Sequence, residues 1–475
     1  MVDIKGFALE QFNETFAQMV SAFLKVAIPT VVASIIFFIQ HLTNMIVAGH
    51  LENKEMLAAI GMGNMIQNCF FISPIMGINS AIETLASQAA GAQNTVLAGH
   101  YLNQAKIVFF SLFVVMILLS LNAQRFLVML HQNEEVSRYT QQYIYYYLPG
   151  LFFYGTSDIL RRFLNSFQKN TLPMISFMIS VILHPLWCYM LAIQYGYKLT
   201  GIALAGCISN LINFVILSTF FNFQTDLEEA NKWISLKNFS GLGSYIQLGV
   251  PMLFVCCLDF WAYECMTILS GIIGIPQQAG QVIVMNMAEM SYQIAWGMQS
   301  AACTVLGNQI GLGNLKGSNA YLRVILIVSL VLNCVEAVVV YRYRHEFLGL
   351  MTDLADVKQA AYTILIYFAI NVFLEGNRGV IRGVIKAMGL QHTQIAIAII
   401  AQWVVAPCLM YYFIFVCQPD GQLHPGLGLA GIWISKLIIE VYINLAYLRI
   451  LYNTDMQAII DETRERFLND DCHLR

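Results

Sequence analysis

Charged side chains are scarce in this sequence of 475 residues. Asp, Glu, Lys and Arg make up 11% of the chain and hydrophobic residues 58%, whereas typical soluble domains contain about 25% charged residues. A chain of this size with so little charge cannot cover a water-facing surface. Its net charge of −3 also provides no basic field for nucleic acid. The composition therefore predicts a multi-pass integral membrane protein and excludes a soluble enzyme, a nucleic-acid-binding protein and a disordered scaffold.

The sequence also lacks the motifs of metal centres and of enzymes. None of the 11 cysteines forms a C-x-x-C pair, so neither a zinc site nor a disulfide framework is indicated. No Walker, G-x-S-x-G or H-E-x-x-H motif occurs, and the pattern Gly426-x-Gly428-x-x-Gly431 follows no predicted strand, which favours helix packing over dinucleotide binding. We therefore expect no metal, no cofactor and no catalytic residue, and only a proton or a sodium ion as the coupling ion.

Apolar runs long enough to cross a membrane recur along the chain. A transmembrane helix needs about 20 mostly apolar residues. Twelve stretches qualify, six in each half of an all-α protein. They cover residues 24–47, 57–85, 103–123, 141–163, 172–194, 201–223, 245–271, 278–304, 320–341, 360–384, 395–417 and 427–452. Lysine and arginine are enriched on the side that this arrangement places in the cytoplasm, which agrees with the positive-inside rule.

The polar stretches between and around these runs give the expected domain organisation. The predicted parts are a cytoplasmic interfacial segment (1–23), an N-lobe (24–223), a cytoplasmic linker (224–244), a C-lobe (245–452) and a cytoplasmic tail (453–475). Each lobe contains six spans, so the second lobe inserts with the same orientation as the first.

The two halves of the chain repeat each other at a nearly constant offset. Pro29 near the start of the first span corresponds to Pro251 near the start of the seventh. The stretch GINSA from Gly77 is similar to GMQSA from Gly297, and GIALAG at 201–206 is similar to GLGLAG at 426–431. Parallel repeats of this kind predict a transporter with its substrate path between the lobes, near the middle of the membrane.

Several motifs resemble those of the multidrug and toxic compound extrusion (MATE) transporters, in particular the eukaryotic branch. They are Pro29 with V-A-G-H-L at 47–51, E-T-L-A-S-Q-A-A-G-A at 83–92, L-D-F-W-A-Y-E at 258–264, and Glu375 followed by Gly383 and G-L-Q at 389–391. The resemblance covers nearly the whole chain. It implies two pseudo-symmetric six-helix lobes in a V shape, a monomer, and efflux of organic cations or xenobiotics.

The sequence departs from the family pattern at four positions, one of which is Phe260, where the family has a tryptophan. Asn44 stands where bacterial members often carry an aspartate in the first span. Asp259 replaces the first glutamate of the seventh-span motif. Asn286 replaces a glutamate of animal members, with Glu289 one turn further along. These departures predict that coupling to protons takes place in the C-lobe.

Four carboxylates in the predicted spans of the C-lobe form the predicted coupling site: Asp259, Glu264, Glu289 and Glu375. A charged side chain in the middle of a bilayer costs at least about 2.5–3.5 kcal/mol, so such residues face the protein interior. A low dielectric there favours the protonated form of a carboxyl group. A carboxyl group that holds a proton in one state can exchange it for an organic cation in another.

Polar and aromatic residues at helical spacing predict the walls of a cavity near these carboxylates. In the span 278–304, Asn286, Glu289, Gln293, Trp296 and Ser300 recur at intervals of three or four and form one stripe. Such a stripe cannot face lipid, and aromatic rings bind cations with their faces. Packing aromatics would give the same pattern, so that alternative stays open. The predicted lining residues are Trp261, Tyr263, Asn286, Tyr292, Gln293, Trp296, Asn44 and His41.

Other charged residues in the spans allow structural interpretations. Glu375 precedes Arg378 by three positions and Lys436 precedes Glu440 by four, which are the spacings of ion pairs on one helix face. Glu336 has no partner in its own helix, and its role stays open. Basic residues after the fourth and tenth spans are interpreted as anchors at the inner membrane face: Arg161, Arg162, Lys169, Arg382 and Lys386.

The sequence therefore predicts a secondary antiporter that exports organic cations or xenobiotics in exchange for protons. We expect it in the plasma membrane or in an organelle or vacuolar membrane, in contact with lipids. Two alternatives from the same superfamily stay open, a sodium-coupled exporter and a flippase for lipid-linked precursors. A membrane-embedded acyltransferase-type enzyme fits less well, because His184 has no carboxylate nearby in the sequence.

Overall fold

The structure is a computed structural model that describes residues 14–49, 54–129, 131–352, 354–416 and 427–474, apart from the side chains at positions 41, 473 and 474. Within these ranges the chain is almost entirely helical and contains no strand. Part of the segment 1–23 and the tip of the motif at 47–51 lie outside the described residues. The predicted all-α class is confirmed.

The N-terminal half contains nine α-helices and two π-helical turns among its described residues. They are α1 (Phe16–Gly49), α2 (Lys54–Gln67), η1 (Asn68–Ile72), α3 (Ser73–Ile78), α4 (Ser80–Gly91), α5 (Thr95–Ser120), α6 (Ala123–Met129), α7 (Glu134–Ser166), α8 (Thr171–Cys188), η2 (Tyr189–Gln194) and α9 (Lys198–Asn222). Two short 3-10 helices, η3 (Thr225–Ala230) and η4 (Leu236–Phe239), form the linker.

The C-terminal half repeats this pattern. Its elements are α10 (Leu242–Ile273), α11 (Ile275–Gly311), α12 (Leu315–Met351), α13 (Ala355–Tyr362), α14 (Leu365–Ala387), α15 (Gln391–Ala398), η5 (Ile399–Val405), α16 (Ala406–Tyr411), η6 (Tyr412–Val416), α17 (Gly428–Asn453) and α18 (Met456–Leu474).

Each predicted span coincides with one helix or with a series of consecutive helices. In the described part of the chain, nine helical segments are long and apolar enough to cross a membrane, and the pair α13–α14, bent by 50°, adds a tenth. The helices α7 and α11, 33 and 37 residues long, complete the twelve-helix fold. These two carry many polar side chains into the protein interior, which lowers their hydropathy.

Prolines determine where two of the spans change their winding. Pro74 and Pro407 each follow a π-helical turn, η1 and η5. A proline ring clashes with the carbonyl group four residues earlier. Those carbonyls belong to Phe70 and Trp403, inside the two turns, so the wider winding relieves the clash.

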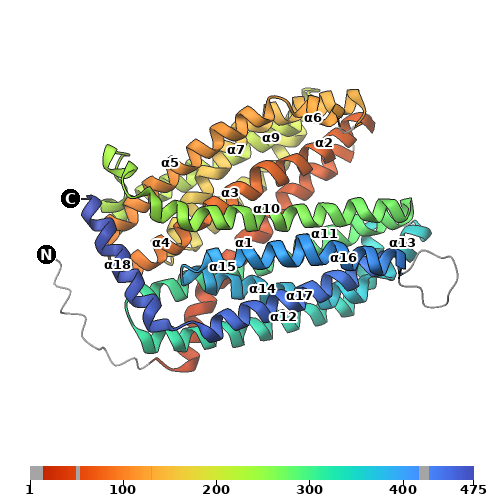
Figure 1. Cartoon of the computed structure of the whole chain (residues 1–475). Coiled ribbons are helices and arrows are strands. Elements are labelled where there is room, and N and C mark those ends of the chain that lie inside the picture. Colours follow the sequence, from red (N-terminus) through yellow and green to blue (C-terminus); the bar gives the residue numbers. More distant parts are fainter. Residues whose placement is uncertain (1–13, 50–53, 130, 353, 417–426, 475) are drawn as a thin grey trace.

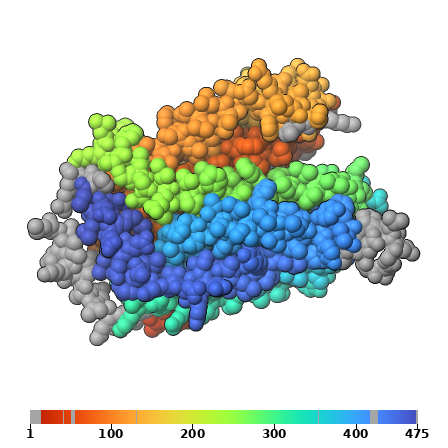
Figure 2. Space-filling model, in the orientation of Figure 1, coloured from red at the N-terminus to blue at the C-terminus, as the bar shows by residue number. Residues whose placement is uncertain are grey.

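The helices form two bundles that converge at one end and diverge at the other (Figure 1). The bundles meet at the end that carries α4 and α18, which we call the inner end because the charge distribution predicts that it faces the cytoplasm. They separate towards α6 and α13, and the space-filling view shows the surfaces of the two lobes parting towards that end (Figure 2). The predicted V shape follows from this divergence.

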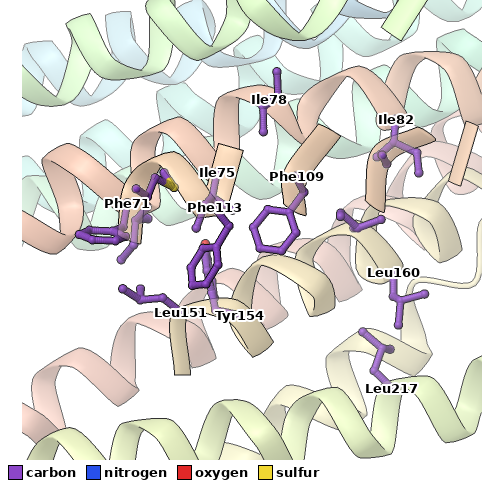
Figure 3. Close-up of a cluster of buried hydrophobic side chains, with 14 of the residues drawn as sticks. Phe71, Ile75, Ile78, Ile82, Phe109, Phe113, Leu151, Tyr154, Leu160 and Leu217 are labelled. Atoms are coloured by element: carbon purple, nitrogen blue, oxygen red, sulfur yellow. The ribbon is translucent and has the colours of Figure 1, made fainter. Parts of the chain in front are cut away.

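Apolar side chains form a separate core in each lobe and a third cluster where α1 joins the C-lobe. Figure 3 shows the N-lobe core, in which Phe109 and Phe113 of α5 lie near Tyr154 of α7. The third cluster joins Phe23 and Val26 of α1 to helices of the C-terminal half. The first helix of one half therefore packs on the other lobe, and α1 already begins at Phe16, inside the segment expected to be interfacial.

The contact between the lobes is itself pseudo-symmetric, because α1 packs on α11 while α10 packs on α3. Glycines make this possible. A Cβ added at Gly77 would lie closer than 3.0 Å to the backbone of Leu253, and one added at Gly297 would meet Val31 in the same way. Small residues at such contacts let helix backbones approach each other in a membrane. The glycines that reveal the repeat in the sequence therefore form the joint between the lobes.

Candidate functional site

A cavity lies between the two lobes. Its walls come from α1, the second span, α10, α11 and α14, and it encloses about 1050 Å³ of space not filled by protein atoms, including the part that opens to the outside. The polar side chains in its wall include Asp259, Glu264, Glu289, Tyr292, Gln293 and Arg378.

Glu264 and Glu289 are the two acids of this wall that have no basic partner among the described residues. Glu289 is exposed to the cavity and Glu264 is half-buried. They lie close enough to interact electrostatically, and no lysine or arginine of the described chain acts on either carboxyl group. Two acids without a base in such a cavity can be neutralised by protons or by a positively charged ligand.

Asp259 and Glu375, by contrast, are held by a buried arginine. The guanidinium group of Arg378 lies 3.2 Å from Asp259 Oδ2 and 2.9 Å from Glu375 Oε1, and its Nε lies 2.8 Å from Glu440 Oε2. Gln402 donates a hydrogen bond to Asp259 at 2.6 Å. Arg378 is 2% exposed. Its single positive charge, buried in the C-lobe, therefore forms ion pairs with three carboxylates.

Two further bases complete this cluster. Arg382 lies 2.6 Å from Asp259, and Lys436 lies 2.7 Å from Glu440. The six residues then carry three negative and three positive charges. We call this set the C-lobe ion cluster; it consists of Asp259, Glu375, Glu440, Arg378, Arg382 and Lys436. Balanced charges of this kind keep each member ionised inside the membrane at lower cost.

The structure thus places three of the four predicted coupling residues in one cavity wall, Asp259, Glu264 and Glu289. Glu375 lies behind the wall, where Asn371 donates to it at 2.9 Å and the Tyr263 hydroxyl also hydrogen-bonds to it. It lines a small neighbouring cavity between α11 and α14.

Two aromatic residues of the wall, Tyr263 and Trp296, lie against charges of the protein itself. The Lys436 ammonium group lies 4.4 Å from the centre of the Tyr263 ring, and the Arg162 guanidinium group lies 5.8 Å from that of Trp296. Tyr292 lies beside Trp296, with 5.9 Å between the ring centroids. These contacts position the two rings. Of the predicted aromatic residues that line this wall, Tyr292 has no protein cation over its ring in the described part of the chain.

Three of the predicted lining residues, Trp261, Asn286 and Asn44, do not belong to this wall in the described structure. Trp261 donates its indole N–H to the Cys69 carbonyl at 3.1 Å, and Asn286 is not part of the lining. Asn44 is buried inside the N-lobe, where its Oδ1 lies 2.8 Å from His184 Nε2. The side chain of His41 lies outside the described residues.

A second buried network joins the lobes at the inner end, and sequence reasoning had placed its bases at the lipid surface. Glu83 lies 2.9 Å from Arg162 in its own lobe and 2.5 Å from Lys386 of the other lobe. The hydroxyl group of Ser300 also donates to it. Arg162 and Lys386 are at most 2% exposed, so the interpretation of these two residues and of Arg382 as lipid anchors is wrong.

Arg378 is the main residue of the cavity wall that sequence reasoning missed. It was interpreted only as a local partner of Glu375. A signal was available, because Arg378, Arg382 and Lys386 are spaced by four residues and so lie on one face of α14. Three bases on one face of a spanning helix indicate a buried network, since unpaired charges are excluded from lipid.

Comparison with known proteins gives the same architecture. The family model MatE matches residues 29–190 and again 251–412, so the two matches are offset by 222 residues, as in the repeat. Among curated relatives, Protein DETOXIFICATION 16 of Arabidopsis thaliana is 26% identical over 440 residues, which is 90% of this chain and 87% of that protein. Protein DETOXIFICATION 13 of the same plant is 27% identical and covers 77% of this chain and 76% of its own.

Solved structures show the same fold. The crystal structure of the eukaryotic MATE transporter AtDTX14 has a TM-score of 0.87 at 21% identity and covers 95% of this chain and 99% of its own. The Vibrio cholerae MATE transporter VcmN, in a mutant form, has a TM-score of 0.82 at 18% identity, with 93% and 99% covered.

Proposed function

Because this chain belongs to the MatE family of MATE transporters, we propose that it exports organic cations or xenobiotics in exchange for protons, with Glu264 and Glu289 as the exchanging groups. Family membership makes the chain a multi-pass membrane transporter and not an enzyme. The identity of the coupling ion and of the substrate belongs to the proposal. The observation that carries it is a pair of acids without basic partners among the described residues, in a cavity between the lobes.

Exchange follows from competition for the same two carboxylates. When both are protonated, the wall is neutral and a bound cation has no counter-charge, so it leaves. When the protons leave, two negative charges in a low-dielectric cavity attract a cation strongly. The C-lobe ion cluster keeps its balanced charge through both steps, and it holds Asp259 and Arg378 in the wall as fixed charges.

The charge of the cavity wall also favours a cationic substrate over a phosphate. The wall contains three acids, Asp259, Glu264 and Glu289, and one base, Arg378. A flippase for lipid-linked phosphates would need a wall with more basic than acidic side chains. For sodium, the described residues contain no group of three or more histidine, cysteine, aspartate or glutamate side chains arranged to hold a metal ion.

In the described part of the chain, the lobes are apart at one end and in contact at the other. The cavity lies between lobes that diverge towards α6 and α13, while the network around Glu83 joins them at the inner end. Transport requires the opposite arrangement as well, in which the inner end opens. We infer that the contact between Glu83 and Lys386 breaks in that step, while Arg162 continues to neutralise Glu83.

Uptake of tetraethylammonium into proteoliposomes under an imposed pH gradient tests the proposal. We expect wild-type protein to accumulate the cation in response to the gradient, and Glu264→Gln and Glu289→Gln each to lower this uptake by at least about tenfold, equal to about 1.4 kcal/mol. Glu228→Gln, an exposed acid of the linker, serves as the matched control and should leave uptake unchanged.

Three results would contradict the proposal. Uptake by the wild type could be indifferent to the pH gradient, or a sodium gradient alone could drive it, which would establish the sodium-coupled alternative. Full gradient-driven uptake by the double variant Glu264→Gln/Glu289→Gln would show that other groups exchange the proton.

A further inference from the structure

Glu336 is a carboxyl group of the membrane interior that has no role in the site described above. It lies in α12, on the face that also carries the buried residues Asn333 and Val340. This face packs against α14 and α11. Val335 and Val338, on the other side of the helix, are exposed at the protein surface. An acid on the inner face of a spanning helix is costly unless it is paired or neutral.

No base neutralises Glu336 in the described part of the chain. Its recorded partners are the hydroxyl group of Ser291, which hydrogen-bonds to it, and the charge of Glu375. Its Oε1 atom is buried without a hydrogen-bond partner. The nearest arginine towards the outer end of α12, Arg342, forms its own pair with Glu346.

The other elements packed on α12 bring no base to Glu336 among the described residues. The helix α11 carries one charged residue, Glu289, which lines the central cavity, and α18 meets α12 at its inner end, where Arg464 lies beside Gly313. The segment at the start of α1 contacts α12 near the inner end of α12, where the Tyr321 hydroxyl group donates to Glu14. The helix α13 carries Asp356 and Lys358 beyond its outer end.

Three of the bases of α14 and α17 belong to the C-lobe ion cluster, where three positive charges already match three negative ones. Lys386 pairs with Glu83, and Arg449 lies in the last two turns of α17, at the inner end. None of these bases forms an ion pair with Glu336 in the described part of the chain.

A negative charge on Glu336 would therefore stand unpaired beside the negative charge of Glu375. Two carboxylates close together in a low dielectric do not both ionise, and the one without a base takes the proton. Arg378 holds Glu375 at 2.9 Å, and Asn371 donates to it as well. The proton thus belongs on Glu336.

A route connects this carboxyl group with the central cavity. Ser291, its hydrogen-bond partner, lines the small cavity between α11 and α14 together with Glu375 and Tyr292. The space there is sufficient for about one water molecule. Tyr292 also lines the central cavity, so its ring separates the two spaces.

We infer that Glu336 is an additional proton-binding site of this transporter, which holds a proton in the conformation seen here and releases it towards the central cavity through Ser291 when a cation binds there. The inference rests on the proposed exchange of cations for protons. In the step itself, the O–H bond of the Glu336 carboxyl breaks and leaves a carboxylate. The Ser291 hydroxyl group takes up that proton while it passes its own to a water molecule in the small cavity, which becomes a hydronium ion, so the hydroxyl group is unchanged at the end. The hydronium ion then gives its proton to the water of the central cavity.

Arg378 provides the coupling between the two events. A cation bound beside Asp259 partly neutralises the negative charge of Asp259. Asp259 then offsets less of the positive charge of Arg378, so the electrostatic potential around Glu375 becomes more positive. A more positive surrounding favours the ionised form of a nearby carboxyl group. Binding of the cation in the cavity therefore favours loss of the proton at Glu336.

Infrared difference spectra of the purified full chain in lipid nanodiscs test the inference, because a protonated carboxyl group has its own C=O stretching band. We expect addition of tetraethylammonium to reduce this band in the wild type, and the component assigned to Glu336 to be missing in Glu336→Gln. Glu346→Gln, an exposed acid near the outer end of the same helix, is the matched control and should keep the whole change. Ser291→Ala keeps the carboxyl group but removes its hydrogen bond, so it should shift the frequency of that component.

Proton release in an unbuffered solution provides the second measurement. Glu336→Gln should release about one proton fewer per bound cation than the wild type. An unchanged band and an unchanged proton count in Glu336→Gln would overturn the inference. If Glu336→Gln fails to fold, Glu336→Asp retains a carboxyl group, and the inference then requires its band and its proton count to match the wild type. Wild-type uptake that ignores the pH gradient would instead refute the proposed function, so the two failures are distinguishable.

Discussion

At the scale of single residues, the C-lobe ion cluster shows which contacts a sequence reveals. The pairs Glu375–Arg378 and Lys436–Glu440 are predictable because they lie three and four positions apart on one helix, and the structure confirms both. The contacts of Arg378 with Asp259 and Glu440 join different helices. Helical spacing carries no information on such contacts, so the cluster as a whole could not be derived.

Arg378 holds the cluster together, which gives a prediction for stability. Arg378→Met leaves Asp259 and Glu375 without their shared base inside the membrane. Breaking a buried pair in this way costs roughly 3–5 kcal/mol, and we expect a clearly lower thermal unfolding midpoint in detergent. Arg342→Met is the control, because its pair with Glu346 is exposed and such pairs contribute at most about 1 kcal/mol. Equal midpoints for the two variants would show that the cluster does not stabilise the fold.

At the scale of helices, hydropathy locates the spans well and their ends poorly. The predicted ninth span covers 320–341, whereas α12 runs over Leu315–Met351. A helix continues beyond the bilayer as long as its backbone can hydrogen-bond, and hydropathy does not report this. Hydropathy and helical spacing also do not show where along a helix the cavity ends, so only part of the predicted polar stripe lines it. Glu289, Gln293 and Trp296 of the stripe face the cavity, while Ser300, further towards the inner end, bonds to Glu83.

The helix contacts at the inner end give a second prediction. A Cβ added at Gly311 would lie closer than 3.0 Å to the carbonyl group of Gln88, across the joint between the lobes. Gly311→Leu should therefore keep the inner ends apart and abolish transport. Spin labels at Gln93 and Lys316, both exposed, should show a longer distance than in the wild type. Gly61→Leu, where a Cβ meets nothing within 4 Å, should leave distance and transport unchanged. A normal distance in Gly311→Leu would show that the joint tolerates bulk.

At the scale of the whole molecule, the internal repeat was the most informative feature of the sequence. The offset of 222 between Pro29 and Pro251 equals that between the two matched segments of the family. The repeat predicts two equivalent lobes, and the structure has them. It does not predict that α1 packs on α11 and α10 on α3, because equivalence of two halves leaves their interface undetermined.

Lys386 gives the last prediction, because it joins the lobes at the inner end. Its ammonium group lies 2.5 Å from Glu83, and Glu83 keeps Arg162 as a second base when Lys386 is lost. Lys386→Met should therefore leave the N-lobe folded and weaken only the closure of the inner end. A hydrogen bond to a charged group contributes about 1.5–3 kcal/mol, which corresponds to roughly a tenfold to hundredfold change in the ratio of inner-open to inner-closed molecules.

The distance between spin labels at Gln93 and Lys316 measures that ratio directly. We expect a second, longer distance to gain population in Lys386→Met. Lys169→Met is the matched control. Lys169 pairs with Asp226 of the linker at 2.6 Å, and among the described residues it forms no ion pair or hydrogen bond with the opposite lobe. The two variants remove the same charge from the same end of the molecule. A shift of equal size in both would mean that net charge controls the inner end, whereas a shift in Lys386→Met alone assigns closure to the contact between Glu83 and Lys386.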